Sequence, residues 1–199
     1  GLAACQPGNK KAQKETDKPE TERPNIFFVI SDDQSFAHTG FAGCEAVHTP
    51  HFDQLAEEGV YFENAYCTAP SSSPSRASVL TGKYAWELDE AANLFSVFPD
   101  EHTTYTALLE DAGYDVAFTG KPWAPGSWKD GGWEKNPTGK EYNDIRTQPV
   151  PEYDEGGIWD VDYAANFKAF LSERDTASPF CFWFGALEPH RKYTTGIGE

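Results

Sequence analysis

Long apolar runs recur along the chain and predict its strands. Residues 25–31 (NIFFVIS) form a continuous apolar run of strand length, which is typical of a strand buried on both faces. Two similar runs cover residues 115–120 (DVAFTG) and 179–187 (PFCFWFGAL). A shorter segment, residues 60–66 (VYFENAY), predicts one more strand. Long connections separate these four predicted strands.

The connections between these strands contain patterns that predict helices. Thr49 followed by Pro50 is typical of a helix start, and Gly59 is typical of a helix end. Apolar residues spaced three and four apart predict two further helices, at residues 105–112 and 163–171. Strands that alternate with helices of this length predict an α/β fold, with a mostly parallel sheet covered on both sides.

A long loop rich in glycine, proline and tryptophan occupies residues 121–157. Loops of this length within compact domains are often functional. Its Trp123, Trp128 and Trp133 are candidates for aromatic walls around a sugar. Core packing or a hinge for a lid is the alternative interpretation for each of them.

Composition limits the function that this fold can carry. The chain has 199 residues, of which 39% are hydrophobic and 15% aromatic, enough to bury a sizeable core. Its formal net charge of -16 excludes nucleic acid as a general partner, because nucleic-acid binding requires a basic face. A small anionic substrate is compatible with this charge if the site itself concentrates positive charge.

The first 23 residues differ from the rest of the chain. The segment LAAC at residues 2–5 resembles a bacterial lipobox, in which the cysteine is lipidated after export; a random alanine-rich end is the alternative. A polar run follows and predicts a flexible tether. We therefore expect residues 1–23 to be a lipobox remnant and tether. We also expect an exported protein, periplasmic or anchored to an outer membrane through a lipid on Cys5, with no other membrane contact.

Polar residues gather where the predicted strands end and where one predicted helix starts. Because the carboxyl ends of parallel strands meet at one edge of a sheet, we expect these residues to converge. Each also has an ordinary interpretation, as a turn former, a solvated lysine or a hydrogen-bonded histidine. The residues at these positions are Asp32, Asp33, Ser72, Arg76, Lys121, Glu188, His190 and Arg191.

These residue types suit the chemistry of a tetrahedral anion. The paired aspartates favour a hard cation such as calcium or magnesium over zinc, since no set of Cys and His ligands accompanies them. Ser72 at a helix start lies where unpaired backbone N–H groups favour an anion. Arg76, Lys121 and His190 would add donors around it. A serine hydroxyl is a weak nucleophile, so Ser72 must be activated or altered.

The segment SSPSRASVLTG, residues 72–82, resembles the signature of the type I sulfatases. That signature is Cys or Ser, any residue, Pro-Ser-Arg and then Leu-Thr-Gly. Further likeness runs in the family's order through PNIFFVISDDQ, TPHFDQLAEEGVYFENAY and FTGK to the PH after the last strand. The resemblance implies an alkaline phosphatase-like fold with a mixed, mostly parallel sheet between helices. It also implies that residues 24–199 are the N-terminal portion of the catalytic domain.

In that family a maturase oxidises the signature Cys or Ser to formylglycine. One hydroxyl of the hydrated aldehyde attacks sulfur, and the bound sulfate leaves as the aldehyde reforms. The roles that the resemblance implies are formylglycine precursor for Ser72, orientation of that group for Arg76, binding of calcium (or magnesium) for Asp32, Asp33 and Ser72, and binding of sulfate oxygens for Lys121 and His190.

Two departures from the family pattern are visible. Trp123 stands where sulfatases commonly have a histidine, two residues after the lysine. The family's remaining calcium ligands and another lysine come from a later segment, so we expect the missing C-terminal part to be a required partner.

The end of the last strand bears on the substrate. EPHR resembles the heparan N-sulfatase branch, with Glu188 in place of an aspartate. We expect a sulfated glycan substrate, with N- or O-sulfate left open, and contacts from Trp123, Glu188 and Arg191. A phosphoesterase of the alkaline phosphatase superfamily and a non-catalytic glycan-binding lipoprotein are the alternatives.

Overall fold

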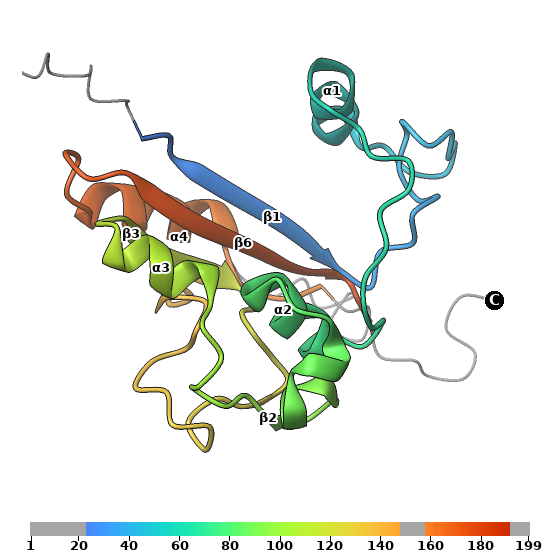
Figure 1. The fold of residues 1–199 in the computed structure, drawn as a ribbon. Helices are drawn as coiled ribbons and strands as arrows, with labels where there is room; N and C mark the ends of the chain where they lie inside the picture. Colours follow the sequence, from blue (N-terminus) through green and yellow to red (C-terminus); the bar gives the residue numbers. More distant parts are fainter. Residues whose placement is uncertain (1–22, 148–157, 192–199) are drawn as a thin grey trace, which may run out of the picture.

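The computed structural model describes residues 23–147 and 158–191. A four-stranded sheet forms the centre of the fold (Figure 1). Every neighbouring pair of strands in it is parallel, which confirms the mostly parallel sheet predicted from the apolar runs. The strands lie in the order β1 (Ile26–Asp32), β6 (Phe180–Pro189), β3 (Asp115–Gly120) and β5 (Lys140–Glu141).

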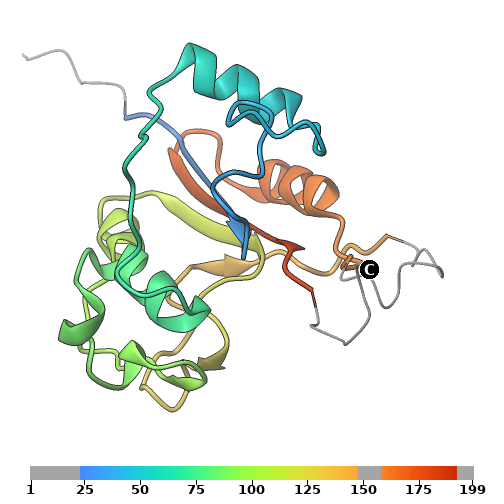
Figure 2. The same cartoon turned by 90° about the vertical axis from the view of Figure 1, so that its right-hand side faces the viewer.

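Helices cover both faces of the sheet at β3 and β6. The edge strand β1 is only half covered, with Phe27 48% and Val29 56% exposed, so the prediction that it is buried on both faces is wrong. On one face, α2 (Ser72–Thr81) and α3 (Tyr105–Asp111) pack against the large apolar side chains of β3 and β6. On the other face, α4 (Tyr163–Glu173) packs against alternate residues of the same two strands. Figure 2, turned from Figure 1, shows α4 and α2 on opposite sides of the strands. The helices predicted near residues 105–112 and 163–171 are thus confirmed.

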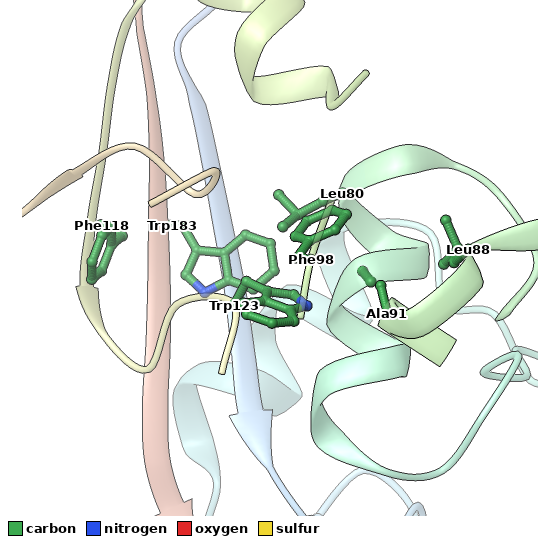
Figure 3. Packing of buried hydrophobic residues seen from close by; sticks show 8 residues of the cluster. Leu80, Leu88, Ala91, Phe98, Phe118, Trp123 and Trp183 are labelled. Atoms are coloured by element: carbon green, nitrogen blue, oxygen red, sulfur yellow. The ribbon is translucent and has the colours of Figure 1, made fainter. Parts of the chain in front are cut away.

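Adjacent residues of β6 serve the two separate cores. Trp183 packs with Phe98, Trp123 and Leu80 under α2, as Figure 3 shows. Phe182 points to the other face, where it joins a cluster with aromatic side chains of α4. Because successive side chains of a strand alternate between faces, a continuous apolar run is what a doubly covered strand requires.

The strand predicted at residues 60–66 is wrong. The segment forms no β-ladder, and Val60, Phe62 and Tyr66 are largely exposed. It lies away from the sheet (Figure 1). A strand needs a neighbour to accept its backbone hydrogen bonds, so its β-branched and aromatic composition alone does not make it one.

The helix predicted after Thr49 is present as α1 (Pro50–Glu58), but its apolar stripe is not buried. Phe52 is 46% exposed and Leu55 is 69% exposed. In Figure 1, α1 stands clear of the sheet. The periodicity therefore predicted the helix correctly but not the burial of its stripe.

Two short strands form a second, separate sheet. β2 (Ser96–Val97) pairs in parallel with β4 (Gly126–Ser127). Of the tether predicted at residues 1–23, residues 1–22 lie outside the described residues. Its last residue, Arg23, donates a hydrogen bond to the carbonyl of Ala112. Within the described part of the chain, no helix has the length and hydropathy needed to cross a bilayer.

The packing around α2 predicts a contrast between two leucines on helices. Leu80 is fully buried in the cluster with Trp183, whereas Leu108 on α3 is 58% exposed. Leu80→Ala should lower the free energy of unfolding by about 2–5 kcal/mol, and Leu108→Ala by about 0.5 kcal/mol or less. Urea unfolding followed by tryptophan fluorescence measures both. Equal losses would show that the cluster under α2 is not a packed core.

Candidate active site

One cleft of about 750 Å³ lies at the carboxyl ends of β1, β3 and β6 and at the start of α2. The structure brings together in it most of the polar residues singled out from the sequence. Those that line the cleft are Asp32, Asp33, Ser72, Arg76, Lys121 and His190.

The hydroxyl of Ser72 is held between a cation and an anion. The ammonium group of Lys121 donates to Ser72 Oγ at 2.8 Å. Ser72 Oγ in turn lies 3.3 Å from Asp32 Oδ1, to which it donates. Lys121 also forms an ion pair with the second oxygen of Asp32. These three side chains come from the start of α2, the turn after β3 and the end of β1.

The start of α2 adds a further attraction for anions. Ser71 precedes the helix in an extended conformation, and its side chain makes no capping hydrogen bond. The first-turn N–H groups of a helix lack intrahelical partners and carry the positive end of the helix dipole. Ser72 is the first residue of this helix and lines the cleft, so its hydroxyl lies at an anion-favouring position.

Arg76 joins the separate parts of the site. Its guanidinium group is 98% buried and donates to the carbonyls of Lys121 at 2.8 Å and Pro122 at 3.2 Å. It also lies 3.3 Å from Asp32 Oδ1. Its charge faces the ring of Trp183 at 5.9 Å. One side chain of α2 therefore fixes the backbone after β3 and the carboxylate that ends β1.

The charges in this cluster shift one another's titration. Burial alone would raise the pKa of Asp32, but the hydrogen bond and charge of Lys121, together with Arg76, outweigh burial and hold that pKa below its usual value. Burial lowers the pKa of Lys121, and the hydrogen bond with Asp32 offsets only part of this effect. The carboxylate of Asp32 thus faces two cations, and its own negative charge is largely compensated.

A close approach of two strands positions Lys121. Its backbone N–H donates to the carbonyl of Gly185 at 2.8 Å. A Cβ atom on Gly185 would lie 2.1 Å from the carbonyl oxygen of Lys121, a distance that no real contact allows. Gly120, just before the lysine, has φ of +75°, a conformation that favours glycine.

Comparison with known proteins decides the family. A sequence model of the sulfatase family matches residues 24–197. The chain belongs to the sulfatase family. This confirms the resemblance of the segment around Ser72 to the type I sulfatases.

Individual relatives agree with this assignment. The sulfatase is 36% identical over 195 residues to an N-acetylglucosamine-6-O-sulfatase of Bacteroides thetaiotaomicron, covering 88% of this chain and 32% of that one. It is 31% identical over 198 residues to an ulvan-active sulfatase of Formosa agariphila, covering 96% of this chain and 36% of that one. The chain therefore spans about a third of the length of these relatives.

Solved structures confirm the fold. A protein solved in complex with its substrate D-glucosamine-2-N,6-O-disulfate superimposes with a TM-score of 0.58 at 28% identity, over 87% of this chain and 36% of that one. A putative sulfatase of Bacteroides fragilis superimposes with the same TM-score of 0.58 at 22% identity, over 90% and 46% of the two chains. These matches place this sulfatase among alkaline phosphatase-like folds and are consistent with an N-terminal part.

The oxygens of the sulfatase site suit a hard cation. Asp32 Oδ2 and Ser72 Oγ converge on one cationic atom, Lys121 Nζ. Asp33 follows Asp32 in the same cleft, with φ of +59°. Two carboxylates and a hydroxyl are an oxygen-only donor set of the kind that calcium and magnesium prefer.

A second acidic group lies elsewhere. The ligand atoms of Asp89, Glu101 and His102 lie within 4.8 Å of one another. The ammonium group of Lys83 lies 3.4 Å from His102 Nδ1. Because the two acidic side chains of this group are exposed and no second observation among the described residues points to a ligand there, we assign no metal to the group.

The interpretation of Trp123 as a sugar-stacking wall is wrong. This side chain is 1% exposed and packs against Phe98 with ring centroids 5.1 Å apart. Its indole N–H donates to the carbonyl of Ser73 at 3.1 Å. Trp123 therefore supports the start of α2 from below. Trp128 also packs against the core, and the indole N–H of Trp133 donates to the carbonyl of Phe98.

Glu188 and Arg191 do not line the cleft. The carboxylate of Glu188 accepts hydrogen bonds from the backbone N–H of Trp159 at 3.0 Å and from the hydroxyl of Tyr163 at 2.8 Å. Arg191 is exposed beyond the end of β6. The substrate contacts expected of these two residues thus give way to a supporting role for Glu188 and to none for Arg191 in this structure.

Among the residues of the cleft that the sequence did not single out are three large apolar ones, Leu94, Phe95 and Trp159. Trp159 follows the glycine-rich loop that was singled out as functional, so its place next to that loop was an available signal. Nothing in the hydrophobic pattern marked Leu94 or Phe95.

The buried position of Arg76 predicts an asymmetry between two Arg–Asp pairs. Arg76→Gln removes the donor to two carbonyls and one of the two cations that face Asp32, and should cost about 3–5 kcal/mol in the free energy of unfolding. Arg146 and Asp160 are paired at 2.6 Å, but both are about half exposed, so Arg146→Gln should cost at most about 1 kcal/mol. Urea titration compares them. A cost for Arg76→Gln no larger than that for Arg146→Gln would contradict the joining role of Arg76.

Proposed function

We propose that the protein hydrolyses sulfate esters or sulfamates of a glycan, with a formylglycine derived from Ser72 as the nucleophile. The observation that carries the proposal is the geometry of Ser72. Its oxygen lies 2.8 Å from Lys121 Nζ and 3.3 Å from Asp32 Oδ1, at a helix start in an open cleft. Membership of the sulfatase family supports the same chemistry.

The reaction starts from a change in Ser72 itself. A maturase removes two hydrogens from its side chain, passes the two electrons to an acceptor of its own, and leaves an aldehyde, which adds water to become a diol. One hydroxyl attacks sulfur and gives up its proton. The bond from sulfur to the sugar oxygen, or to the sugar nitrogen in a sulfamate, breaks, and that atom leaves with a proton. The second hydroxyl then loses its proton, the aldehyde reforms and sulfate is released. This route supplies the activation that a plain serine lacks.

The surrounding residues hold charge and protons in this scheme. The oxygen at position 72 donates a hydrogen bond to Asp32 and accepts one from Lys121. The same ammonium group and the start of α2 would stabilise the negative charge that grows on the sulfate oxygens. His190 lines the cleft and would donate to a sulfate oxygen. Arg76 keeps Asp32 and Lys121 in place.

Asp32, Asp33 and the oxygen at position 72 would hold calcium, with magnesium as the alternative ion. When bound, the ion supplies positive charge that stabilises the anionic oxygens of the site. Both oxygens of Asp32 already face cations, so a bound ion would have to take the place of one of these partners.

The substrate we propose is a sulfated amino sugar of the glycosaminoglycan type. One relative is named as an N-acetylglucosamine-6-O-sulfatase, and one structural neighbour was solved with a disulfated glucosamine as its substrate. Because the chain spans about a third of these relatives, the proposed activity belongs to a protein of their full length.

Export completes the proposal. We propose that residues 24–199 supply the nucleophile-bearing part of the catalytic domain, and that Cys5 carries a lipid in an exported bacterial protein. Cys5 and most of the proposed tether lie outside the described residues. A periplasmic or outer-membrane position would give the protein access to glycans taken up from outside.

Conversion of Ser72 can be tested directly. Mass spectrometry of the peptide that contains Ser72, from the native host, should show the loss of two hydrogens or the corresponding hydrate. Full-length matured protein should release sulfate from D-glucosamine-2-N,6-O-disulfate, and Ser72→Ala should lower the rate at least about 1000-fold. Ser172→Ala, exposed on α4, is the matched control and should retain the rate.

The same assay separates the alternatives. Faster hydrolysis of an aryl phosphate than of any sulfated substrate, by protein with unmodified Ser72, would replace the sulfatase proposal with a phosphoesterase. Release of no sulfate by converted protein would also contradict it.

Metal removal provides an independent test. A chelator should lower the rate of sulfate release about 100-fold or more, and added calcium should restore it. Asp33→Asn should lower the amount of calcium retained per protein, measured by atomic emission, whereas Asp130→Asn, exposed in the loop after β4, should not. Full activity at zero metal content would rule out the proposed ion.

A further inference from the structure

The cleft around Ser72 has an apolar side that the proposed reaction does not use. Leu94, Phe95 and Trp159 line this cleft. They are 44%, 76% and 49% exposed, respectively. They come from two segments more than sixty positions apart in the sequence. Large apolar side chains exposed together at a polar cleft often mark a binding surface.

The backbone of Phe95 is held in an unusual conformation. Its φ is +57°, which is unusual for a bulky residue. Its neighbours fix it on both sides. Ser96 pairs with Gly126 in the ladder between β2 and β4, and its hydroxyl donates to the carbonyl of Asn93 at 2.7 Å. With this backbone conformation the side chain of Phe95 is largely exposed and lines the cleft.

Trp159 is held at the cleft by the end of β6. Its backbone N–H donates to Glu188 Oε1 at 3.0 Å, and Glu188 Oε2 accepts from the hydroxyl of Tyr163 at 2.8 Å. That hydroxyl also accepts from the backbone N–H of Leu187 at 3.0 Å. The chain of contacts ties Trp159 to the same strand whose carboxyl end leads to His190, so the aromatic ring and the polar site share one support.

The two kinds of surface in this cleft match the two parts of a sulfated sugar. The cationic end with Lys121 suits an anionic group, while aromatic rings suit the C–H face of a pyranose. We propose that Phe95 and Trp159 form the stacking surface for the sugar ring whose sulfate lies at Ser72, and that Glu188 is a positioning residue that acts through Trp159. The identity of the ligand rests on the proposed function.

Equilibrium binding tests this without turnover. The probe is D-glucosamine-2-N,6-O-disulfate, titrated calorimetrically into full-length protein that carries Ser72→Ala in every variant. Adding Phe95→Ala or Trp159→Ala should weaken sugar binding about tenfold, which corresponds to the worth of one aromatic contact of about 1.4 kcal/mol. Affinity for inorganic sulfate should not change, because sulfate has no C–H face to stack on a ring.

Matched controls come from exposed aromatics outside the cleft. Phe36 is 67% exposed and Trp86 is 74% exposed, and neither lines the cleft. Phe36→Ala and Trp86→Ala should leave sugar affinity unchanged. Trp159→Phe should restore most of the affinity lost in Trp159→Ala, since a ring is again present.

The role of Glu188 is read from a double-mutant cycle. Glu188→Ala should weaken sugar binding, and its combination with Trp159→Ala should be no weaker than Trp159→Ala alone. Glu188→Gln, which keeps an oxygen acceptor, should bind nearly as tightly as the parent. Additive losses would show that Glu188 does not act through Trp159.

Three results would overturn the stacking surface. The first is that Phe95→Ala and Trp159→Ala bind the sugar as tightly as the control variants do. The second is that these two variants lose as much affinity for inorganic sulfate as for the sugar. The third is that the parent protein does not bind the sugar. Failure of the proposed function looks different: converted protein that binds the sugar through Trp159 but releases no sulfate would end the hydrolase proposal and keep the surface.

Discussion

The buried guanidinium of Arg76 is the interaction on which the rest of the site depends. It connects helix α2 to the backbone after β3 and to the carboxylate at the end of β1. Each of these partners lies 44 to 46 positions from Arg76 in the sequence, so their meeting depends on the folded sheet. A buried charge must find partners, and here the partners are the groups that place Lys121 and Asp32 beside Ser72.

This local cluster also resolves an apparent conflict in the charge of the protein. The chain as a whole carries a formal charge of -16, yet the family to which it belongs handles an anion. Lys121, Arg76 and the start of α2 bring positive charge into the same cleft as the carboxylates of Asp32 and Asp33. The other acidic side chains act at longer range, where salt screens their charge. The attraction of an anion to the cleft is then determined by the charges close to it.

Sequence reasoning predicted the elements and the strand ends well because both follow from short-range rules. Apolar runs located β1, β3 and β6, and the ends of parallel strands brought Asp32 and Lys121 together with Ser72. Burial was harder to predict. Trp123 looked like a loop residue but fills the core, whereas Val60 looked like part of a strand and is exposed. Which side chain enters a core depends on distant segments, and no local pattern contains that information.

The contact between Gly120 and Gly185 limits which substitutions the protein can accept. Any side chain on Gly185 would collide with the carbonyl of Lys121, so the floor of the cleft tolerates almost no variation. Phe95 and Trp159, by contrast, lie on connecting segments outside the helices and main strands, and such segments accept substitution more readily. A change of ligand preference is therefore easier to reach through these connecting segments than through the glycine contact that places Lys121.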